Sequence, residues 1–144
     1  MGLKRGVGIG ILALLALGRG PAGAEDFLYA PGRWAYDRGD YQKARDIFQG
    51  ELQNSPNDAD AAYGLGNSLY QLGQYDQASQ AYQKCLQDDP KLEAGWYNLG
   101  NSLYQQKDYQ GAAQSYQKAL DLDPKDQDAA RNLKLARSKI PPSP

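Results

Sequence analysis

Apolar and small residues recur along this chain at the spacing of amphipathic helices that come in pairs. Ala62, Leu65 and Leu69 fall on one side of a helix drawn at 100° per residue. A second apolar stripe, from Tyr75 to Leu86, follows after a glycine and is closed by Pro90, since proline restricts the preceding residue and ends helices. The pattern therefore predicts a helical hairpin.

The hairpin pattern repeats with a fixed period. Residues 59–92 and 93–126 are identical at 18 of 34 aligned positions, and residues 25–58 form a weaker first copy. In that copy Pro31 replaces a leucine, so its first helix is expected to begin near Pro31 and to be short. Such self-similarity predicts an all-α stack of three units, none of which can bury its apolar face alone.

A last amphipathic segment follows the three copies. We expect a capping helix over residues 127–140 and an extended, proline-rich tail over residues 141–144. The apolar residues assigned to the capping helix are Ala129, Ala130, Leu133, Leu135 and Ala136.

The N-terminus resembles an export signal. Lys4 and Arg5 precede an apolar run over residues 7–17, and residues 22–24 supply the Ala-Gly-Ala pattern that signal peptidases read. The run is shorter than the ~20 residues that span a bilayer. Residues 1–24 are therefore predicted to be a signal peptide, and the mature chain to be periplasmic or secreted, without stable membrane insertion.

Charge argues against nucleic acid as a partner. Removing residues 1–24 takes away three of the 16 basic residues and none of the 17 acidic ones, so the formal net charge changes from −1 to −4. Phosphate binding is carried by a basic surface. No nucleic-acid partner is expected.

The residue types needed for catalysis or metal binding are scarce. The sequence has no histidine, and its one cysteine, Cys85, aligns with Ala119 at a packing position. Serine therefore has no evident base, and no cysteine or histidine cluster suits zinc. We expect no enzyme activity, no cofactor and no metal site.

The repeat carries a family signature. It consists of Trp96, Leu99, Gly100, Tyr104, Tyr109, Ala112, Tyr116, Ala119 and Pro124, most of which recur 34 residues earlier. This signature resembles the tetratricopeptide repeat, which implies a right-handed superhelix of antiparallel helix pairs whose first helices line a concave, peptide-binding groove. Residues 97–101 and 128–137 are also similar to exported repeat proteins of bacterial aerotolerance (Bat) operons, which implies a von Willebrand type A domain protein as a partner.

A polar and aromatic stripe on the first helices is the candidate binding site. Its members are Tyr29, Arg33 and Tyr36, then Tyr63, Asn67 and Tyr70, then Tyr97, Asn101 and Tyr104, with Asn98 and Asn132 beside them. Tyrosine offers a rigid ring with a polar rim, and asparagine can bond a guest backbone. The same residues could instead pack between neighbouring helices, and both roles can coexist.

Two further features bear on partners. Arg131 belongs to a basic cluster on the capping helix, which either complements the negative end of that helix or docks an acidic surface. The faces holding Tyr63, Asn67 and Asn98 lack the cations that would grip an acidic C-terminal peptide. We therefore expect a scaffold that binds other proteins or peptides in an envelope complex; the alternative is a non-catalytic subunit of a cell-wall or envelope enzyme complex.

Overall fold

The computed structural model describes residues 30–142, and all regular structure within them is helical. The elements are α2 (Pro31–Asp37), α3 (Tyr41–Asn54), α4 (Ala59–Gln71), α5 (Tyr75–Asp88), α6 (Glu93–Gln105), α7 (Tyr109–Leu122) and α8 (Gln127–Lys139). The predictions made for the signal peptide, for Tyr29 and for the last two residues of the tail lie outside this range. The expected all-α class is confirmed.

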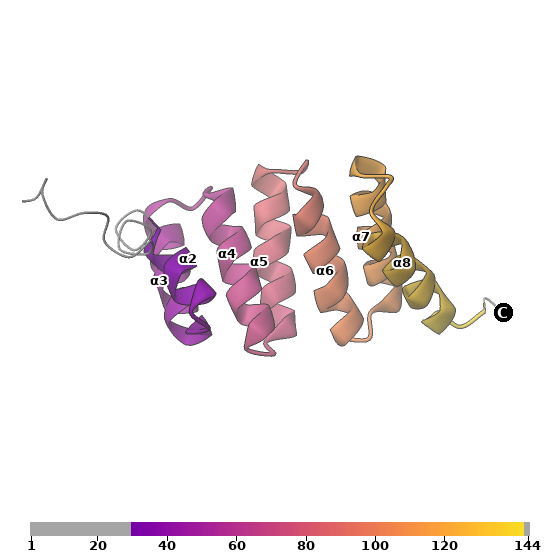
Figure 1. Cartoon of the computed structure of the whole chain (residues 1–144), viewed down its shortest axis with the longest axis horizontal. Coiled ribbons are helices and arrows are strands. Elements are labelled where there is room, and N and C mark those ends of the chain that lie inside the picture. Colours follow the sequence, from indigo (N-terminus) through magenta and orange to yellow (C-terminus); the bar gives the residue numbers. More distant parts are fainter. Residues whose placement is uncertain (1–29, 143–144) are drawn as a thin grey trace, which may run out of the picture.

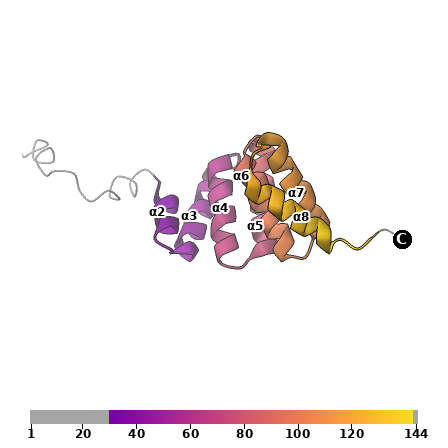
Figure 2. The same ribbon diagram turned by 45° about the vertical axis from the view of Figure 1, so that its right-hand side comes forward.

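Helix pairs follow one another along the long axis of the molecule, with α2 at one end and α8 at the other (Figures 1 and 2). Each helix packs mainly on its neighbours in the chain, so every hairpin is covered by the next. This is the one-dimensional stacking that a repeat predicts. The short first helix begins at Pro31, as the sequence indicates.

Local signals explain where the helices begin and end. The carboxylates of Asp40, Asp58 and Asp108 accept hydrogen bonds from backbone N–H groups in the first turns of α3, α4 and α7. At their C-terminal ends, α3, α5 and α7 each stop two residues before a proline, because proline disfavours helical backbone in the residue that precedes it. Side-chain caps and prolines therefore define the hairpins.

Close approach within each hairpin depends on one glycine. A Cβ at Gly66 would lie 2.6 Å from the ring of Tyr82, and one at Gly100 would lie 2.7 Å from the ring of Tyr116. Ala78 and Ala112 are fully buried beside them. These are contact positions, as their small size predicts.

The capping helix buries only part of its apolar residues. Ala129, Leu133 and Ala136 of α8 are buried, but Leu135 is 45% exposed and Ala130 is exposed as well. Only one hairpin lies beneath α8, so the buried stripe is narrower than the run of apolar residues suggests.

Candidate functional site

Asparagine and tyrosine side chains on the first helices form links between successive hairpins. Asn67 Oδ1 on α4 accepts hydrogen bonds from the Tyr82 hydroxyl on α5, at 2.7 Å, and from Asn98 Nδ2 on α6, at 3.1 Å. The Asn98 amide also donates to the Tyr63 hydroxyl at 3.0 Å. One asparagine therefore joins three helices. We call this arrangement the asparagine link.

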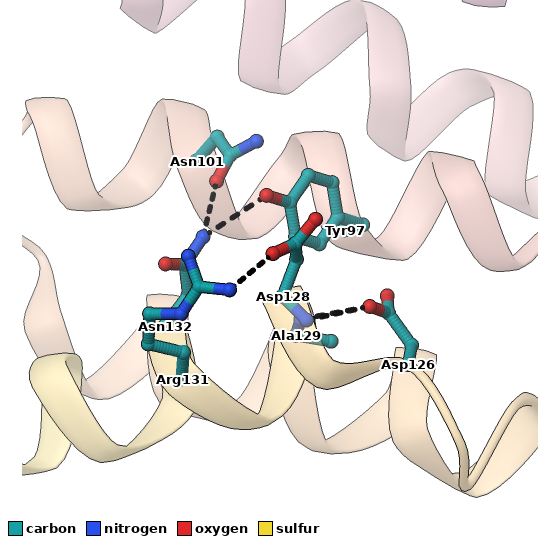
Figure 3. A network of polar contacts seen from close by, with 7 residues as sticks. All are labelled: Tyr97, Asn101, Asp126, Asp128, Ala129, Arg131 and Asn132. Carbon is teal, nitrogen blue, oxygen red and sulfur yellow. Dashed lines mark hydrogen bonds and ion pairs between the residues drawn. The ribbon is translucent and has the colours of Figure 1, made fainter.

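The same link recurs one repeat later, between α6, α7 and α8. Asn101 Oδ1 accepts from the Tyr116 hydroxyl at 2.8 Å and from Asn132 Nδ2 at 3.4 Å. Asn132 also donates to the Tyr97 hydroxyl at 3.1 Å, and Figure 3 shows the bonds from Asn132 to Asn101 and Tyr97. The predicted stripe thus has the structural role that the sequence left open.

Burial changes the chemistry of the linked hydroxyls. Tyr82 and Tyr116 are 1% and 2% exposed. Burial, followed by the neighbouring tyrosines, raises the pKa of both phenols above the usual value. They therefore stay protonated as hydrogen-bond donors and are not candidate bases.

The remaining tyrosines of the stripe pack on the second helix of their own hairpin. The pairs Tyr36–Tyr41, Tyr70–Tyr75 and Tyr104–Tyr109 each have ring centroids 5.2 Å apart in an edge-on arrangement. Such pairs fix the ring orientation. All six rings are only partly buried, so one side of each stays open to solvent.

Hollows lie between successive first helices of residues 30–142, and we name three of them by position. The middle hollow, of about 150 Å³, is lined by Tyr36, Asn67, Tyr70, Gln71, Tyr82, Asn98 and Asn101. The C-terminal hollow, of about 160 Å³, is lined by Tyr70, Asn101, Tyr104, Gln105, Tyr116, Asn132 and Leu135. The N-terminal hollow, of about 660 Å³, is lined by Ala30, Gly32, Arg33, Tyr36, Asp37, Phe48, Glu51, Asp58, Asp60, Ala61, Tyr63, Gly64 and Asn67.

Most of the predicted site residues therefore line an accessible hollow and also take part in contacts between helices. Two of them differ from the rest. Tyr97 lines none of these three hollows and is occupied by its bond from Asn132. Arg131 lies apart from the stripe and pairs with Asp128 at 2.6 Å, so part of the basic cluster is neutralised within α8 (Figure 3).

Several lining residues were not predicted from the sequence. Gln71 and Gln105 occupy equivalent positions at the ends of α4 and α6, and the acidic residues of the N-terminal hollow come from three different helices. The glutamines could have been found by their 34-residue spacing. The acidic grouping could not, because it arises only when α2, α3 and α4 pack together.

Other kinds of site find no support in the part of the chain that the structure describes. Residues 30–142 contain no cluster of three or more potential metal-ligating acidic or cysteine side chains, and none of their helices is long and apolar enough to cross a bilayer. Cys85 is buried, and burial together with nearby carboxylates raises the pKa of its thiol to about 11. Its packing role is confirmed.

These features define a solenoid of helical hairpins. The family model described as tetratricopeptide repeat matches residues 29–93 and 63–127, and the chain belongs to that family. Comparison with curated protein sequences finds no match.

Solved structures of similar fold come from several organisms. The Sgt2 repeat domain from Aspergillus fumigatus is 24% identical, with a TM-score of 0.71 over 87% of this chain and 88% of that one. The Yersinia enterocolitica secretion chaperone SycD, in complex with a YopD peptide, is 22% identical, with a TM-score of 0.72 over 80% and 93%. The second repeat domain of human RPAP3, in complex with the HSP70 peptide SGPTIEEVD, is 15% identical, with a TM-score of 0.72 over 74% and 89%.

Proposed function

We propose that this protein is an exported scaffold that holds peptide segments of partner proteins against its first helices and so assembles an envelope complex. The observation that carries the proposal is the row of three hollows between α2, α4, α6 and α8. A row of hollows along one face suits an extended chain that places successive side chains into them.

The lining chemistry supports a peptide ligand. Partly exposed tyrosine rings offer rigid apolar area with few rotamers to freeze on binding. The exposed amides of Gln71 and Gln105 can both donate to and accept from a guest backbone. SycD and RPAP3, which share the fold, were each solved with a bound peptide.

An acidic peptide like the one bound to RPAP3 is not the ligand that we propose for this chain. A carboxylate-rich ligand needs lysine or arginine donors. Arg33 is the one cation among the residues that line the three hollows, and its hollow is also lined by four carboxylates.

The proposal is tested by filling the two smaller hollows. Gln71→Trp with Gln105→Trp places bulky, uncharged rings at two exposed, repeat-equivalent positions. Proteins captured from envelope extract by the tagged chain, and identified by mass spectrometry, should be largely lost. Gln80→Trp with Gln114→Trp, on exposed positions of α5 and α7, is the matched control. Capture by the first variant at the wild-type level would contradict the proposal.

Export is tested separately. Sequencing the N-terminus of protein purified from a bacterial host should give Glu25 as the first residue, because cleavage is proposed after Ala24. Recovery of protein that begins at Met1 would contradict export.

A further inference from the structure

The junction between the first two hairpins lacks both asparagines of the asparagine link and the second-helix tyrosine that bonds them. In the first repeat, Arg33 occupies the position of Asn67 and Asn101. Likewise, Phe48 occupies the position of Tyr82 and Tyr116. Asn98 and Asn132 correspond to Gly64. The bonds that close the other two junctions therefore cannot form here.

The missing link leaves space. The N-terminal hollow has a volume of about 660 Å³, against about 150 and 160 Å³ for the hollows at the linked junctions. Its floor is the ring of Phe48, which touches the backbones of both first helices. A Cβ at Gly32 would lie 2.7 Å from that ring and one at Gly64 would lie 2.4 Å from it. Phe48 is 9% exposed, so its ring offers a narrow apolar edge, and the volume of the hollow is large enough for one bulky apolar side chain beside it.

Charge distinguishes this hollow from the other two. Its lining contains Asp37, Glu51, Asp58 and Asp60, whereas no charged residue lines the middle or C-terminal hollow. Arg33 lies 3.8 Å from Asp37 and offsets one of these four negative charges, which leaves a formal charge of 1 − 4 = −3. The rim is thus net acidic around an apolar floor.

The carboxylates near the floor act on each other. Burial, and then the charge of Asp58, raise the pKa of Glu51. Asp58 is held in place by its hydrogen bond from the Ala61 backbone N–H, at 2.9 Å. A bound cation would relieve the repulsion between these carboxylates.

We propose that the N-terminal hollow docks a peptide segment in which a bulky apolar side chain stands next to a lysine or arginine. The inference rests on the proposed function, which it narrows to one hollow and one ligand class. The apolar side chain lies over Phe48, and the cation faces the carboxylates of Glu51 and Asp60. The chain's own segment before Ala30 is a poorer occupant, since it begins with Glu25 and Asp26 and carries the same charge as the rim.

The probe is a library of random peptides displayed on phage and selected on the tagged mature chain. Enriched sequences should share a lysine or arginine next to phenylalanine, leucine or tryptophan. Synthetic copies should bind more weakly as NaCl is raised from about 50 to about 500 mM, because exposed charges are screened. Binding should shift the backbone amide signals of Gly32 and Gly64 in the NMR spectrum.

The charge contribution is tested by Glu51→Gln with Asp60→Asn. Affinity for the selected peptides should fall about tenfold and depend less on salt, as expected when two rim charges are removed. Asp76→Asn with Asp121→Asn makes the same change of charge outside the hollows and should leave the affinity unchanged.

The shape contribution is tested by rebuilding the link. Arg33→Asn, Phe48→Tyr and Gly64→Asn together install the residues of the other junctions and should weaken binding by at least about tenfold. If this variant does not fold, the charge variant still decides the question.

Failure of the inference differs from failure of the proposed function. Selected peptides that bind equally well to the charge variant, yet are blocked by Gln71→Trp with Gln105→Trp, would overturn the inference and leave peptide binding intact. Enriched peptides without a cation would overturn it as well. If no peptide is enriched and envelope proteins are also not captured, both proposals fail.

Discussion

At the scale of single residues, one backbone position recurs in all three hairpins. Gly39, Gly73 and Lys107 are 34 residues apart and have φ angles of 79°, 73° and 65°. This left-handed conformation is open to glycine, but it costs other residues about 1 to 2 kcal/mol. The third turn thus carries strain that the first two avoid.

Lys107→Gly should therefore raise the free energy of unfolding by about 0.5 to 1 kcal/mol, after allowing for the greater entropy of glycine in the unfolded chain. Urea denaturation followed by circular dichroism measures the change. The reverse substitution, Gly73→Lys, should lower stability by a similar amount. If both variants matched the wild type, the turns would be free of this strain.

The asparagine link also acts at this scale. Asn101→Ala should cost about 1 to 3 kcal/mol, because it leaves the buried Tyr116 hydroxyl without its acceptor. Adding Tyr116→Phe should recover part of the loss in denaturant unfolding. Arg33→Ala, at the equivalent exposed position, should change stability by no more than about 0.5 kcal/mol. Equal effects at the two positions would contradict a structural role for Asn101.

Cys85 makes alkaline stability sensitive to pH. The pKa of the Cys85 thiol is about 11 in the folded chain, against a usual value of 9.0. As the pH rises, the unfolded chain therefore loses the thiol proton before the folded chain does. The associated stability is present below about pH 9 and is lost as the pH rises toward 11. Cys85→Ala should therefore show a shallower fall in unfolding free energy between about pH 8 and about pH 10.5. An unchanged slope would mean that the thiol does not contribute.

At the scale of elements, α8 behaves as a cap with one buried stripe. Leu133 is 7% exposed and packs with Ala112, Ala113 and Tyr116 of α7, whereas Leu135 is 45% exposed. The two leucines lie in the same helix but differ in burial. Replacing each by alanine therefore distinguishes the contribution of packing from that of helix propensity.

Leu133→Ala should lower the free energy of unfolding by about 2 to 4 kcal/mol through lost burial and a cavity. Leu135→Ala should change it by no more than about 0.5 kcal/mol, because Leu135 has little burial to lose. Thermal and urea unfolding measure both. Similar losses for the two variants would show that α8 packs in another orientation.

Elements were also the scale at which the sequence was most informative. Breaks such as Pro90 and the 34-residue period predicted the helix pairs, because a proline acts on its immediate neighbours and the period repeats the same local pattern. The exposure of Leu135 could not be predicted, because hydrophobicity does not tell how wide a stripe the neighbouring helix covers. The linked role of Asn67 could not be decided, since its amide partner Asn98 lies 31 residues away.

At the scale of the whole molecule, we expect α2 to be the least stable helix of residues 30–142. Helix α2 has only seven residues, and its junction with α4 lacks the asparagines of the link. Interior hairpins are covered on both sides. In a repeat protein, stability is carried by such neighbour contacts.

Hydrogen exchange followed by mass spectrometry should therefore show α2 exchanging first and α5 and α6 last. Installing the link by Arg33→Asn, Phe48→Tyr and Gly64→Asn should slow exchange in α2 if the variant folds. Uniform exchange from α2 to α8 would instead indicate a single cooperative unit.

The sequence by itself determined the helices, their pairing and the family, because caps, prolines and repeat spacing are local or periodic properties. Only the tertiary structure decided which asparagines link hairpins and where the largest of the three named hollows opens. Those outcomes depend on residues from three helices meeting at one junction, where a glycine in place of an asparagine removes a bridge and leaves an acidic space.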